Sequence, residues 1–68
     1  MTRRPKTLDE VDWEGAADAF VKAARNMTLS EIIAQAQVGE AWFESRGDAE
    51  NAEVYRRVAA ILQRRLLN

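Results

Sequence analysis

The sequence predicts an all-α protein: a small three-helix bundle, or a helical hairpin plus a third helix, that associates through exposed apolar faces. The single proline is Pro5, so no later residue interrupts helix formation. Helix-forming residues dominate, β-branched runs are nearly absent, and no segment alternates as a strand does. Two segments, Thr7–Glu10 and Thr28–Glu31, have the capping-box form that opens helices.

The first helix is expected at about residues 8–26. Thr7–Glu10 supplies the capping box, and the acidic residues that follow suit the positive end of a helix dipole. Trp13, Phe20 and Met27 recur every seven residues and define one apolar face. The helix is expected to end near Asn26.

The second and third helices are expected at about residues 29–46 and 49–66. Thr28–Glu31 opens the second, Gly47 is placed to end it, and Asp48 is placed to cap the third. The apolar positions of the third helix follow the i, i+4, i+7 pattern: Val54, Val58, Ile61, Leu62 and Leu66. Acidic residues gather at 9–18 and basic residues at 54–68, which favours charge pairing between the first and last helices.

Residues 27–47 allow two interpretations. In the preferred one they form one continuous helix, with Gly39 near the middle of its apolar stripe, where the missing side chain lets another helix approach. In the other, the chain breaks near Val38–Gly39 into two helices.

The broken form resembles the helix-turn-helix of bacterial repressors over "TLSEIIAQAQVGEAWF". The positions that correspond are Ala34, Ala36, Val38 and Glu40. This chain departs from the pattern at Gln37, which stands where the turn glycine belongs. The resemblance implies a DNA-binding transcriptional regulator that uses residues 28–47. Its nucleic-acid contacts would be Arg3, Arg4, Lys6 and Arg46.

The chain is short enough for one domain, residues 7–68, preceded by a flexible basic arm at residues 1–6. A domain of this size usually needs disulfides, a metal or a partner chain. It has no Cys and no His, which excludes disulfides and thiolate or imidazole metal sites and leaves a partner as the source of extra stability.

No apolar run approaches the ~20 residues of a membrane span, so we expect a soluble cytoplasmic protein. Abundant Ala and Arg suit a bacterial or phage genome.

The sequence contains few of the residues that usually catalyse reactions. Without His or Cys, most nucleophile and general-base arrangements are unavailable. The carboxylates fall at helix ends and exposed positions, and the three isolated glycines form no phosphate-binding loop. We expect no enzyme, no cofactor, no metal and no small-molecule substrate.

The aromatic side chains are the candidate partner-binding residues, because Trp and Tyr are favoured anchors at interfaces. They are Trp13, Phe20, Trp42, Phe43 and Tyr55. The same residues could instead fill the core, although Trp42 lies at the edge of its stripe, which suits an interface.

The expected function is therefore that of a non-enzymatic interaction protein. It would act as an adaptor, regulator or inhibitor by covering the surface of another protein or of a second copy, as a homodimer. The DNA-binding regulator is the alternative. A helical module that becomes ordered only on binding is a third possibility at this length.

Overall fold

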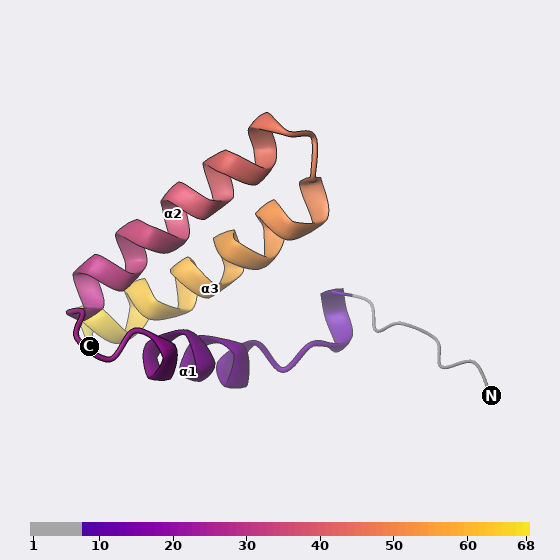
Figure 1. Cartoon of the computed structure of the whole chain (residues 1–68). Coiled ribbons are helices and arrows are strands. Elements are labelled where there is room, and N and C mark those ends of the chain that lie inside the picture. Colours follow the sequence, from indigo (N-terminus) through magenta and orange to yellow (C-terminus); the bar gives the residue numbers. More distant parts are fainter. Residues whose placement is uncertain (1–7) are drawn as a thin grey trace.

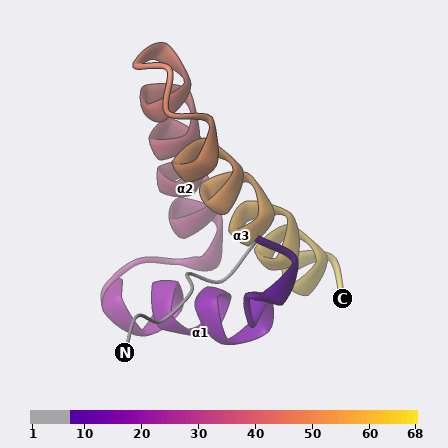
Figure 2. The same ribbon diagram turned by 90° about the vertical axis from the view of Figure 1, so that its right-hand side faces the viewer.

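The computed structural model describes residues 8–68 and shows three α-helices. A short 3-10 helix, Leu8–Glu10, is followed by α1 (Trp13–Ala23), α2 (Leu29–Ser45) and α3 (Ala49–Leu67). α2 and α3 lie side by side as an antiparallel hairpin, and α1 runs crosswise near one end of it (Figures 1 and 2). The prediction of an all-α protein with three helices is confirmed.

Local signals set the ends of the hairpin helices, as predicted. The Thr28 hydroxyl accepts the Glu31 N–H at 3.2 Å, and the Glu31 carboxylate accepts the Thr28 N–H at 2.7 Å, which completes the capping box. Gly47 adopts the left-handed region, with φ of 77°, where it follows α2. Asp48 then caps α3 by accepting the Asn51 N–H at 3.2 Å.

α2 runs without interruption from Leu29 to Ser45. Residues 28–47 therefore contain one helix, and the predicted alternative of a helix-turn-helix break near Val38–Gly39 is wrong. The glycine has a packing role instead. A Cβ at Gly39 would overlap the ring of Tyr55 on α3, so the bare backbone lets the two helices approach closely at this level.

The first helix begins at Trp13 rather than at Leu8. Asp12 caps it by accepting the Gly15 N–H at 3.0 Å. The Trp13 indole N–H donates to the Leu8 carbonyl at 2.9 Å, which ties the 3-10 helix Leu8–Glu10 to the first residue of α1. The predicted capping residue Thr7 lies outside the described residues.

The first helix also ends earlier than predicted, at Ala23 rather than near Asn26. The N–H of Met27 donates to the carbonyl of Ala24 at 3.2 Å across the connecting turn. Met27 packs against the core, and Thr28 must be extended to cap α2. The chain therefore leaves the helix before these two residues.

The core lies where α1 crosses the hairpin. Its buried residues are Ala17 from α1, Ile32 and Ile33 from α2, and Val58, Ile61 and Leu62 from α3. Charged pairs join α1 to α3 at the rim of this core. Arg65 donates to Asp18 at 2.7 Å and to Glu14 at 2.8 Å, so the predicted charge pairing between the first and last helices is confirmed.

The capping box makes a testable prediction about pH. Because the Glu31 carboxylate accepts the backbone N–H of Thr28, its pKa in the folded protein lies below the ordinary value of 4.5. A carboxylate with a lowered folded-state pKa stabilises the protein above its unfolded-state pKa, and this contribution is lost as the pH falls through the folded-state pKa.

We therefore expect Glu31→Gln to flatten the acid end of the stability profile. The amide oxygen of glutamine can still accept the Thr28 N–H but does not titrate. Urea unfolding of the two proteins between about pH 6 and pH 3 measures the difference. Equal loss of stability on acidification in both would show that the ionisation of Glu31 does not contribute to the pH dependence of folding.

Candidate protein-binding surface

Four of the five candidate aromatic residues form a continuous series of ring contacts across the three helices. Phe20 on α1 meets Tyr55 on α3 edge-on, with centroids 5.3 Å apart. Tyr55 meets Phe43 on α2 at 5.3 Å, and Phe43 meets Trp42 edge-on at 4.9 Å. We call these four residues the aromatic row. Phe20, Phe43 and Tyr55 are less exposed than Trp42, which is 50% exposed, so the row runs from the interior to the surface.

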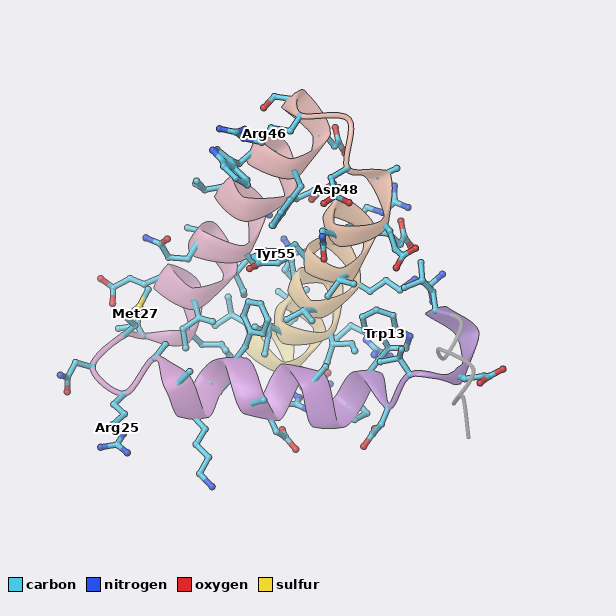
Figure 3. The ribbon with its side chains drawn as sticks, turned by 45° about the vertical axis from the view of Figure 1, so that its right-hand side comes forward. Trp13, Arg25, Met27, Arg46, Asp48 and Tyr55 are labelled. Atoms are coloured by element: carbon cyan, nitrogen blue, oxygen red, sulfur yellow. The ribbon has the colours of Figure 1, made fainter. Side chains whose placement is uncertain are left out.

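Arg46 occupies the exposed end of the aromatic row. Its guanidinium carbon lies 4.3 Å from the centroid of the Trp42 ring, a cation–π arrangement. In Figure 3, Met27 lies near the start of α2, and Arg46 lies at the opposite end of this helix. Arg46 was predicted as a nucleic-acid contact in the helix-turn-helix alternative. The structure places it against an aromatic ring at the end of a continuous helix.

Trp13 stands apart from the aromatic row. It begins α1, about two helical turns before Phe20, and its indole N–H is committed to the Leu8 carbonyl. The guanidinium of Arg57 on α3 lies 5.2 Å from its ring. Trp13 thus fastens the segment before α1 to the hairpin, and its surroundings are those of a structural residue.

α2 carries a second apolar stripe on the face that points away from α3. Its residues are Ala34, Val38, Ala41 and Trp42, all exposed, and we call them the outer stripe. Val38 is 64% exposed. Their spacing of i, i+4, i+7 and i+8 places them on one side of the helix. In contrast, the exposed residues of α3 between Glu50 and Arg64 are mostly charged or amide, and the exposed leucines of this helix, Leu66 and Leu67, lie at its C-terminal end.

An apolar hollow lies between α1 and α2 beside the outer stripe. It has a volume of about 440 Å³. Its lining is Ala19, Phe20, Ala23, Ala24, Met27 and Gln35, and we call it the α1–α2 groove. Gln35 precedes Val38 and Trp42 by three and seven residues, so the groove opens onto the same side of α2 as these two residues.

Arg3, Arg4 and Lys6 lie outside the described residues. The arginines of α3 are engaged within the molecule: Arg57 binds Glu53 at 2.7 Å, and Arg64 and Arg65 bind Glu14. Within residues 8–68, no three or more acidic, His or Cys side chains come together as metal ligands. No helix in this range is both long and apolar enough to cross a membrane.

The sequence indicated the aromatic residues but not the groove. The outer stripe has a visible signal, because Ala34, Val38 and Ala41 repeat the i, i+4, i+7 pattern on the side opposite the buried residues. No pattern in the sequence indicates the groove, because the groove depends on the angle at which α1 crosses the hairpin. Comparison with protein-family models, with curated proteins and with solved structures found no match to this chain.

Proposed function

We propose that this chain is a non-enzymatic protein–protein interaction module that acts by covering the surface of a partner. The observation that supports this proposal is the outer stripe, in which Val38 and Trp42 are exposed on α2 beside the apolar α1–α2 groove. Single exposed apolar residues are ordinary on a protein surface, whereas a contiguous set of this kind supports an interaction role.

Trp42 is suited to be the anchor of such a site. Trp and Arg are enriched among residues that dominate binding energies, and here Trp42 and Arg46 lie against each other. Phe43 also contacts the indole, in an edge-on arrangement. A side chain already held in place loses less conformational freedom on binding, so more of its contact energy becomes affinity.

The proposed role is that of an adaptor, regulator or inhibitor whose partner is another protein or a second copy of this chain. The absence of Cys fits a reducing compartment, and we propose that the protein acts in the cytoplasm. The DNA-binding alternative needs a turn inside residues 28–47, and the continuous α2 does not provide one. No observation favours it as a second candidate.

A photo-reactive amino acid at position 38 tests the proposal. In cells that naturally contain the protein, illumination should join Val38 variants covalently to a partner. The same residue at Gln63, exposed on α3, is the control and should give little adduct. Equal or absent adducts at the two positions would refute a binding role for the outer stripe.

A further inference from the structure

We propose that the partner of the outer stripe is a second copy of this chain. Two α2 helices pack antiparallel about a two-fold axis between Val38 and Gly39, and each Trp42 enters the α1–α2 groove of the other copy. This inference rests on the proposed function and names its partner.

The surface carries both a projecting group and a hollow that can receive it. Trp42 projects from α2 half-exposed, and the groove beside Gln35 is apolar. An apolar cavity of about 150 Å³ is enough to bind benzene. The groove, at about 440 Å³, therefore has room for an indole ring.

The positions of Trp42 and Gln35 on α2 define where the two-fold axis must lie. Gln35 and Trp42 lie at equal distances in sequence from the midpoint between Val38 and Gly39, about 5 Å to either side along the helix. A two-fold axis at this midpoint brings Trp42 of each copy opposite Gln35 of the other. In such an isologous contact, one residue pair is made twice.

The same two-fold axis also pairs residues of opposite charge. Glu31 and Arg46 are also equidistant from the midpoint, so the axis sets Glu31 of each copy opposite Arg46 of the other. Both have free capacity within residues 8–68. Glu31 uses Oε1 for the cap while Oε2 has no partner, and Arg46 makes no ion pair there, only its contact with the Trp42 ring. An acid at one end of the stripe and a base at the other make the face self-complementary.

The position of α1 leaves room for this arrangement. A two-fold axis that passes between two antiparallel helices, perpendicular to the plane that contains them, places the same flank of both helices on the same side of the pair. Here that flank is the one that faces α1. α1 crosses the hairpin near the start of α2, and the far end of α2 extends beyond it (Figures 1 and 2). The α1 helix of the second copy can therefore lie beside that uncovered end.

Sedimentation equilibrium tests the pairing. An interface confined to one helix face and a groove is small, so the dimer should form in the micromolar range or above. The mass should rise with concentration from 7.7 kDa toward twice that value. Trp42→Ala should raise the dimer Kd by about 30-fold or more, as expected for an anchor residue. Leu67→Ala, at an exposed position outside the stripe, should leave the Kd unchanged.

A second pair of variants blocks the groove without altering Trp42. Ala23→Arg places a bulky charged side chain in the groove lining and should abolish the dimer. Ala60→Arg makes the same change at an exposed position on α3 and should not. Far-UV circular dichroism should show the same helix content in both.

Charge exchange tests the antiparallel register. Glu31→Arg alone sets Arg against Arg46, and Arg46→Glu alone sets Glu against Glu31, so each variant should be monomeric. An equimolar mixture restores two opposite-charge pairs and should form a heterodimer. The cap is weakened equally in the separate and the mixed samples, so this rescue reports on pairing rather than on folding.

The outcomes separate the two proposals. A wild-type chain that stays monomeric at millimolar concentration, or a dimer indifferent to Trp42→Ala and Ala23→Arg, would overturn the self-pairing. If the photo-reactive group at position 38 then captures a different protein, the proposed interaction role stands without the dimer. If it captures nothing above the Gln63 control, both proposals fail.

Discussion

Replacing Leu62 by alanine should remove a large part of the stability of this protein, about 2–5 kcal/mol. Leu62 is one of the two largest fully buried side chains and lies in the cluster where α1 crosses the hairpin. The loss combines the transfer energy of the deleted carbons with the cavity left behind. Domains of this length are stable by only about 3–10 kcal/mol, so a substantial unfolded fraction is expected.

Leu67→Ala is the matched control, because it makes the same chemical change in the same helix at a residue that is 85% exposed. It should change the stability by less than about 0.5 kcal/mol. Urea unfolding followed by circular dichroism measures both variants. The protein concentration must be equal in all samples, since self-association would add to the apparent stability. Equal losses for Leu62 and Leu67 would contradict the position of the core.

Replacing Gly39 by alanine should destabilise the protein although it improves the helix propensity of α2. The propensity gain is about 1 kcal/mol. It is opposed by overlap of the new methyl group with the ring of Tyr55, which is held between Phe20 and Phe43. Forcing extra carbon into a packed site costs about 1–3 kcal/mol, and moving this ring disturbs the aromatic row, so we expect a net loss of up to about 2 kcal/mol.

The control is the same substitution in a Tyr55→Ala background. With the ring absent, the overlap disappears and only the propensity remains, so Gly39→Ala should stabilise that variant by up to about 1 kcal/mol. The reversal of sign is measured by a double-mutant cycle from four urea titrations. Stabilisation by Gly39→Ala in the wild-type background would show that Tyr55 does not pack against this glycine.

The boundaries that the sequence predicted well depend on neighbouring residues. Thr28 and Glu31 satisfy each other within one helical turn, and Gly47 and Asp48 act on their own backbone or the next turn. Such signals are contained in a few consecutive residues. The start of α1 was missed although its cap is also local, because Asp12 accepts the Gly15 N–H. Two cap-like signals stand close together here, Thr7–Glu10 and Asp12, and neighbouring residues alone did not decide between them.

The candidate site was predictable in part for the same reason. The pattern of apolar residues placed Trp42 at the edge of its stripe, and Trp42 is 50% exposed. The division of the aromatic residues was not predictable. Phe20 joins Phe43 only through Tyr55, and Trp13 is separate from them, because the packing of three helices decides which rings meet.

Fluorine NMR of Trp42 tests the central claim, that the outer stripe of α2 is covered by a partner, most directly. In a Trp13→Phe variant labelled with 5-fluorotryptophan, the only fluorine signal comes from Trp42. Its shift between H2O and D2O reports contact with solvent. In dilute solution the signal should show the half-exposed indole, and at high concentration and inside cells it should show a shielded one. A signal equally exposed to solvent under all three conditions would contradict the claim.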